Sequence, residues 1–171
     1  MAIRALIDYP SDILSRPCMP VSVFDGALSE LARDLADTLD AAQAAGLAGP
    51  HIGALVRIVV LRPEPGQPAS VYVNPEIAWA SPERVSGIEG SVSMPGIRET
   101  VERAAAVRVR FATLDGASRE EEAEGFRAAC LQHEIDQLDG LFWIERLSRL
   151  RRDRARRRHA KAVKTGTPPA R

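Results

Sequence analysis

The sequence predicts an α+β fold in which antiparallel or mixed β-sheets surround a central helix. Three observations lead to this prediction. Residues 25–45 have the apolar spacing of a helix, residues 55–114 contain several short β-branched segments, and residues 121–138 have helical spacing again. Because strands and helices do not alternate along the chain, a doubly wound parallel sheet is not expected.

Length and composition agree with one compact domain that carries a short appendage. The chain has 171 residues, of which 45% are hydrophobic, enough to form a core. No apolar run approaches the roughly 18 to 20 residues that span a bilayer, and the N-terminus lacks the features of a signal peptide. Cys18 and Cys130 form no CxxC pair, so a disulfide scaffold is not expected. We therefore expect a monomeric cytoplasmic protein without membrane contact.

The first helix is predicted from leucines that recur every three or four residues, namely Leu28, Leu31, Leu35 and Leu39. Asp25 is suited to cap its N-terminus. Gly46, and then Gly49 with Pro50, are expected to end it.

Four strands are predicted, at residues 55–61, 71–73, 98–104 and 106–114. The second is expected to stop at Asn74-Pro75. Asp115-Gly116 is a turn signal after the fourth.

The helix predicted at residues 121–138 has an apolar stripe on one face and Cys130, His133 and Gln137 on the nearly opposite face. Such a helix is expected to be buried on both sides. His133 and Gln137 are four residues apart, so both should point to the same spot, with Glu134 beside it. This is the spacing of the HExxH motif, in which two His bind a metal and Glu acts as general base, but Gln137 stands at the second His. On spacing alone, a hydrogen-bonded core histidine is the alternative interpretation of His133.

Three segments resemble the signature motifs of the peptide deformylase family, in the family's order and at compatible separations. Residues 46–53 (GLAGPHIG) are similar to GLAAPQIG, residues 89–96 (EGSVSMPG) to EGCLSVPG, and residues 132–140 (QHEIDQLDG) to QHEIDHLDG. The similarity extends over about residues 3–148. On these motifs the chain is identified as a member of this fold family.

The resemblance implies a specific chemistry. Members of the family bind Fe²⁺ or another divalent ion through one Cys and two His, and the metal activates a water that removes the formyl group from the N-terminal Met of new proteins. The Glu of the HExxH-type motif carries the proton. A Gln of the first motif and a backbone N–H beside the Cys stabilise the oxyanion. The implied partners are therefore the N-termini of nascent peptides.

The resemblance places the metal-binding positions on three residues of this chain. His133 corresponds to the first His ligand, and Glu134 corresponds to the catalytic Glu, so both are kept. Ser91 stands at the Cys ligand and Gln137 at the second His ligand, so these two ligand positions are degenerate.

The oxyanion positions and the peptide groove are also placed by the resemblance. His51 stands at the oxyanion-binding Gln, and Val92 follows the lost Cys, where the family supplies a backbone N–H. The expected groove residues match the family: Gly46, Leu47, Ala48, Gly53, Glu89 and Gly90.

The replaced ligands predict a weak metal site. A hydroxyl and an amide are neutral oxygen donors, whereas Fe and Zn prefer nitrogen and sulfur. Two lost ligands should lower metal affinity or activity by at least about 10²- to 10⁴-fold. We therefore expect no cofactor, or at most one weakly bound divalent ion, Fe²⁺ or Zn²⁺. Two alternatives stay open: a rearranged site in which His51 joins His133 and Glu134, with Ser91 or Gln137, and a Ser91 nucleophile with His51 or His133 as base.

The C-terminal segment, residues 149–171, differs from the domain expected at residues 1–148. It holds ten Lys or Arg residues and one acid, although the whole chain has no net charge. Its composition favours a helix up to Lys164, and residues 165–171 are expected to fray. It resembles the basic C-terminal helix of many bacterial deformylases, which implies contact with ribosomal RNA phosphates. A solvated helix is the alternative, and the lack of aromatic residues argues against a dedicated nucleic-acid module.

Three functions follow from these observations. The first is a deformylase-like protein whose metal-dependent deformylation is lost or strongly reduced, and whose groove binds peptide N-termini or a ribosomal partner. The second is an active metallo-hydrolase that removes the formyl group from the N-terminal formyl-Met of nascent proteins through a rearranged metal site. The third is a structural role unrelated to the groove.

Overall fold

The computed structural model describes residues 2–64 and 66–165 and has the predicted α+β architecture. Its strands form two antiparallel sheets, one with the order β1-β2-β3-β6-β7 and one that pairs β4 with β5. The strands are β1 (Gly46–Ala48), β2 (Ile58–Leu61), β3 (Ser70–Ala80), β4 (Arg84–Glu89), β5 (Glu99–Ala104), β6 (Ala106–Ala112) and β7 (Ser118–Glu124). The helices are α1 (Gly26–Ala41), α2 (Gly125–Leu138) and α3 (Arg149–Thr165), with the short 3-10 helices η1 (Asp12–Ser15), η2 (Gly49–Ile52) and η3 (Trp143–Arg146).

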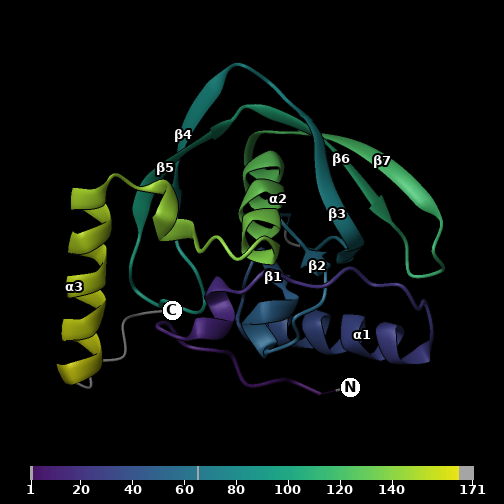
Figure 1. Cartoon of the computed structure of the whole chain (residues 1–171), viewed down its shortest axis with the longest axis horizontal. Coiled ribbons are helices and arrows are strands. Elements are labelled where there is room, and N and C mark those ends of the chain that lie inside the picture. The colour runs from purple at the N-terminus through teal and green to yellow at the C-terminus, as the bar shows by residue number, and fades with distance from the viewer. Residues whose placement is uncertain (1, 65, 166–171) are drawn as a thin grey trace.

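Helix α2 stands at the centre of the molecule, as the two-faced pattern predicts (Figure 1). Strands β3, β6 and β7 lie on one side of it and β4 with β5 on the other, while α1 runs beneath. The apolar face of α2 packs on the larger sheet through Leu131, Ile135 and Leu138, which are buried with residues of β2, β3 and β6. The opposite, polar face is therefore left to line a site between the two sheets.

Helix α1 has the predicted N-terminus but ends earlier than expected. Asp25 caps it, because its carboxylate accepts the N–H of Leu28 at 3.1 Å. Leu28, Leu35 and Leu39 are buried against β1, β2 and β3. The helix ends at Ala41, and the chain then turns into β1.

The prediction that a strand stops at Asn74-Pro75 is wrong, because β3 continues to Ala80. Asn74 has a φ of 51°, and the register with β6 shifts between Val73 and Glu76. The Asn74 side chain accepts the N–H of Val21 at 2.7 Å and donates to the Val21 carbonyl at 2.8 Å. These two bonds hold an irregularity that lets the strand accommodate a proline.

The prediction of a helix from residue 121 is wrong at its start. Residues 118–124 (SREEEAE) form β7, and α2 begins only at Gly125. Arg108 and Arg110 of β6 lie directly opposite Glu122 and Glu120 in the sheet register. Because these cross-strand pairs join opposite charges, they stabilise as a strand a segment whose composition favours a helix.

Helix α3 packs against the domain rather than projecting from it. Ala155 and His159 are buried, and His159 Nε2 donates to the Tyr9 carbonyl at 2.8 Å. Arg151 and Arg158 both bind the carboxylate of Glu99 at the start of β5. Of the residues expected to fray, Thr165 is the last residue of α3, and residues 166–171 lie outside the described part. Within the described residues, no helix is both long and apolar enough to cross a bilayer.

Candidate functional site

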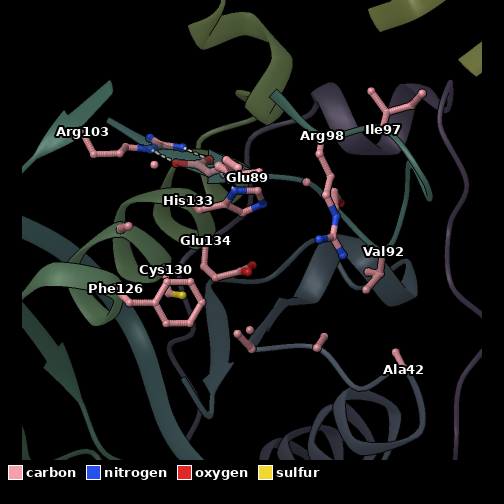
Figure 2. A pocket seen from close by; sticks show the side chains of 18 of the residues that line it. Ala42, Glu89, Val92, Ile97, Arg98, Arg103, Phe126, Cys130, His133 and Glu134 are labelled. Atoms are coloured by element: carbon pink, nitrogen blue, oxygen red, sulfur yellow. Dashed lines mark hydrogen bonds and ion pairs between the residues drawn. The ribbon is translucent and has the colours of Figure 1, made fainter. Parts of the chain in front are cut away.

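A cavity of about 550 Å³ opens beside the polar face of α2 (Figure 2). Its walls come from β1, from β4 and the loop that follows it, and from α2 between Gly125 and Glu134. The sequence-predicted residues that line it are Gly46, His51, Glu89, Gly90, Ser91, Val92, His133 and Glu134. Leu47, Ala48, Gly53 and Gln137 are not among its lining residues. Three motifs that are far apart in the sequence thus meet around one space.

His133 is held in a defined orientation. Its Nδ1 lies 3.0 Å from Glu89 Oε2. Arg103 and His133 lower the pKa of Glu89 to about 2 against the opposing effect of burial, so Glu89 is ionised and Nδ1–H donates to it. Burial lowers the pKa of His133, but the bond to Glu89 and the charges of Glu134 and Glu89 outweigh it and raise the pKa. Nε2 is left for a ligand, the arrangement that orients a metal-binding histidine.

Glu89 belongs to a buried charge network behind the cavity. Arg103 donates to both carboxylate oxygens of Glu89, at 2.7 and 2.9 Å, and its third nitrogen binds Asp136. Arg146 donates twice to Asp136. Every charged group in this network has a partner, so the network fixes β4, β5, α2 and η3 relative to one another.

Sequence reasoning missed Arg103. Its position in β5 indicates that its side chain is buried. Side chains two residues apart on a strand share a face, and Val101 is buried. An arginine at an inward position of a strand is expected to bind buried acids, since an unpaired charge there would be too costly.

Glu134 lies deep in the cavity against β1. Burial raises the pKa of its carboxyl from 4.5 to about 7, against the lowering effect of the His133 charge. Its Oε2 accepts no hydrogen bond from the described residues. A Cβ at Gly46 would lie 2.7 Å from Glu134 Oε1, so glycine leaves the room that this carboxyl occupies.

His51 is buried beside Glu134, with its Nδ1 3.7 Å from Glu134 Oε2. Nδ1 accepts the N–H of Ala48 at 3.0 Å, so the proton of the neutral ring is on Nε2. Burial lowers the pKa of His51 to about 3, with a further contribution from His133, so the ring is neutral. Its Nε2 is buried and has no partner among the described residues.

The two degenerate ligand positions make different contacts. Ser91 Oγ accepts the N–H of Ser93 at 3.2 Å. The Gln137 amide is buried, and its Nε2 donates at 2.8 Å to the carbonyl of Leu14 in η1. Ser91 forms no hydrogen bond with either histidine in the described part, so a serine nucleophile has no base to activate it.

The donor set does not fit Fe²⁺ or Zn²⁺. His133 presents one imidazole nitrogen, but a neutral hydroxyl and a neutral amide, whose nitrogen donates to the Leu14 carbonyl, replace the other two donors. The rearranged site would need His51, His133 and Glu134 to converge. Across residues 2–64 and 66–165, no three His, Cys, Asp or Glu side chains form a group that could hold a metal ion.

A His–Glu pair that a central helix presents to a cavity, within an α+β frame, resembles the arrangement of HExxH-type hydrolases, with Gln137 at the position of the second His. Residues 3–153 match the polypeptide deformylase family. A peptide deformylase-like protein of Bradyrhizobium diazoefficiens is 54% identical over 154 residues, which are 90% of this chain and 91% of that protein. A peptide deformylase of Nitrobacter hamburgensis is 40% identical over 96% of this chain and 98% of that protein.

Comparison with solved structures indicates the same family. The crystal structure of a peptide deformylase from Legionella pneumophila superposes with a TM-score of 0.90 at 37% identity, covering 96% of this chain and 98% of that one. This chain therefore belongs to the peptide deformylase family, whose members are metal-dependent hydrolases.

Proposed function

We propose that this protein binds peptide N-termini in the cavity and has lost, or almost lost, metal-dependent deformylation. The observation that carries the proposal is the contrast between an intact cavity and an altered donor set. The cavity, His133 and Glu134 are in place, whereas Gln137 donates to a backbone carbonyl and Ser91 offers a neutral oxygen. Peptide deformylase-like proteins of Bradyrhizobium diazoefficiens and Brucella melitensis are 54% and 48% identical, above the 40% of the peptide deformylase of Nitrobacter hamburgensis, which supports a separate branch.

The cavity has the hydrogen-bonding groups that an N-terminal amide needs. His51 Nε2–H is a buried donor without an acceptor, and Glu134 Oε2 is a buried acceptor without a donor. A formyl-amide offers one carbonyl oxygen and one N–H, which are the kinds of partner that these two groups lack. Because a buried group without a partner costs about 1–3 kcal/mol, a ligand that supplies both partners gains affinity.

The test combines a metal measurement, an activity assay and a binding assay. The protein is purified anaerobically, bound Fe and Zn are quantified, and formate release is followed with a formyl-Met peptide. Binding of the same peptide is measured by calorimetry. We expect binding with substoichiometric metal and no formate release. Stoichiometric metal together with formate release would contradict the proposal.

Back-substitution tests whether the donors alone account for the loss. We expect Ser91→Cys with Gln137→His and His51→Gln to bind one divalent ion and release formate. Ser91→Cys alone is the matched control and should gain neither property. A triple variant that folds but binds no metal would mean that the cavity itself has changed.

The basic helix α3 supports a second partner, an RNA phosphate backbone. Arg154, Arg157, Lys161 and Lys164 recur every three or four residues, are exposed, and form no ion pair within the described residues. They therefore share one outward face, while the docked arginines face the domain. Co-sedimentation with ribosomes tests this surface: replacement of all four by Gln should abolish it at low salt, and unchanged sedimentation would reject the contact.

A further inference from the structure

Arg98 is a cation of the cavity wall to which the sequence motifs assign no role. It lines the cavity and is exposed, and Figure 2 shows its guanidinium across the opening from Phe126, beside Val92. It has no ion pair or hydrogen bond to any other described residue. An arginine placed at a cavity mouth in this way is free to bind a ligand.

The backbone around Arg98 fixes the base of its side chain. Ile97 is buried, and its carbonyl oxygen lies only 3.0 Å from the position that a Cβ on Gly90 would take. Arg98 Cγ lies 3.4 Å from that same position, so the side chain runs over the backbone of Gly90. The guanidinium is thus held next to the segment that carries Ser91 and Val92.

Two acids on the strands beside Arg98 are already bound by other cations. Glu99, the next residue, is bound by Arg151 at 2.9 Å and by Arg158, both from α3. Glu89 lies opposite Glu99 in the register of β4 and β5, and Arg103 and His133 bind it. The packing of α3 and the buried network therefore leave Arg98 at the cavity mouth without an ion-pair partner among the described residues.

The same opening has an apolar rim. Val85, Ile88 and Phe126 line the cavity with exposed side chains. A peptide bound there would place an apolar first side chain against this rim and the residues that follow it beside Arg98. The surface thus combines an apolar contact with one positive charge.

We propose that Arg98 makes the cavity selective for peptides with an acidic second or third residue after an apolar N-terminal residue. This inference rests on the proposed binding of peptide N-termini. A carboxylate on the second or third residue forms an ion pair with the guanidinium, and a lysine there is repelled. An ion pair at such an exposed position supports an affinity ratio of about 3- to 5-fold between acidic and neutral peptides.

The experiment measures binding of three formyl-Met peptides that carry Asp, Asn or Lys at the second and third positions and a fluorophore at the C-terminus. For the wild-type protein, anisotropy titrations should rank Asp above Asn above Lys, with ratios that shrink as salt is added. Arg98→Glu should invert this order. Arg33→Glu, which makes the same charge change on an exposed residue of α1 outside the cavity, should keep the wild-type order.

The failures of the two proposals are distinguishable. If none of the peptides binds the wild-type protein, the proposed function is wrong and the selectivity falls with it. If the peptides bind and Arg98→Glu keeps the order Asp, Asn, Lys, only the selectivity is overturned.

A second variant tests why Arg98 is free. Arg151→Gln with Arg158→Gln leaves the carboxylate of Glu99 without its cations, and this extra negative charge one residue from Arg98 should weaken the preference for Asp. Thermal unfolding of this variant verifies that the domain is folded. A folded double variant with the full wild-type preference would contradict the role of Glu99.

Discussion

The polar face of α2 contacts two regions that differ in how completely their polar groups are paired. Behind the cavity, Glu89, Arg103 and Asp136 bind one another, and every charge has a partner. Inside the cavity, His51 Nε2 and Glu134 Oε2 are equally buried and have no partner among the described residues. The protein thus keeps a fully paired frame around a centre whose hydrogen bonds remain to be made, which is what a ligand-binding site requires.

The frame should be the more costly of the two to disturb. Arg103→Met fills a similar volume but leaves the carboxylates of Glu89 and Asp136 without their shared cation. Removing one member of a buried ion network destabilises a protein by about 3–5 kcal/mol. Urea unfolding should therefore show a loss of this size, with loss of folding at 37 °C as the extreme outcome.

The control for this change is Arg108→Met in the exposed pairs between β6 and β7. Arg108 binds Glu122 at 2.7 Å on the surface, where solvent screens the charges. Its replacement should leave the urea midpoint almost unchanged. Equal losses for the two variants would mean that burial of the Arg103 network adds nothing.

The two carboxyls of the site should affect stability with opposite pH dependence. For Glu134 the pKa is about 7 in the folded protein and 4.5 in the unfolded chain, so only the folded state keeps the proton between these values. Its contribution is fully present below about pH 4.5 and is lost as the pH rises through about 7. The full effect is on the order of 3 kcal/mol. Chemical unfolding of wild type and Glu134→Gln from pH 4 to 8 should give curves that diverge by this amount.

Glu89 has the opposite sign. Its pKa of about 2 lies below the unfolded value of 4.5, so its contribution is present above about pH 4.5 and is lost as the pH falls through about 2. Glu89→Gln should therefore be destabilised at neutral pH and should lose less stability on acidification than the wild type.

For Glu134, the contradicting result is a stability of Glu134→Gln that changes with pH in parallel with the wild type from pH 4 to 8. Such a result would contradict the raised pKa of Glu134.

The smallest expected effect on stability is the difference between substitutions at Gln137 and at Ser91, the two degenerate ligand positions. Gln137→Leu removes the donor to the Leu14 carbonyl, leaving that carbonyl without this bond, so we expect a loss of about 1–3 kcal/mol. Ser91→Ala removes one acceptor from a half-buried loop and should cost well under about 1 kcal/mol. Thermal unfolding of both variants distinguishes a glutamine that now stabilises the fold from a serine that does not. Equal losses would remove this distinction.

Several features of the fold were predictable from local patterns. The leucine spacing and Asp25 gave the start of α1, and the two-faced pattern around His133 gave a central helix. Strand β7 was not predictable in this way, because its glutamates are paired with Arg108 and Arg110 of β6 only in the folded sheet. Strand β4 was missed as well: its side chains are mostly exposed, so the segment has no apolar face by which to recognise it.

The candidate site was predictable in its membership but not in its contacts. The motifs identified His51, Ser91, His133 and Glu134, and the structure brings all four to one cavity. Spacing alone placed Gln137 beside them, whereas its amide donates to a carbonyl 123 positions away in the sequence. No role was predicted for Arg98. It is free to bind a ligand because other arginines bind the acids on the neighbouring strands, and those contacts form only in the folded protein.

The sequence by itself determined the family of this protein and predicted which residues stand at the family's metal-ligand positions, because both depend on residue types at fixed spacings. The tertiary structure decided which polar groups are paired. Partners such as Gln137 with Leu14, Arg103 with Asp136 and Arg151 with Glu99 are far apart in the chain and meet only through packing. Since the free energy of a buried polar group depends on whether its partner is present, the three-dimensional contacts decide which residues stabilise the frame and which remain for a ligand.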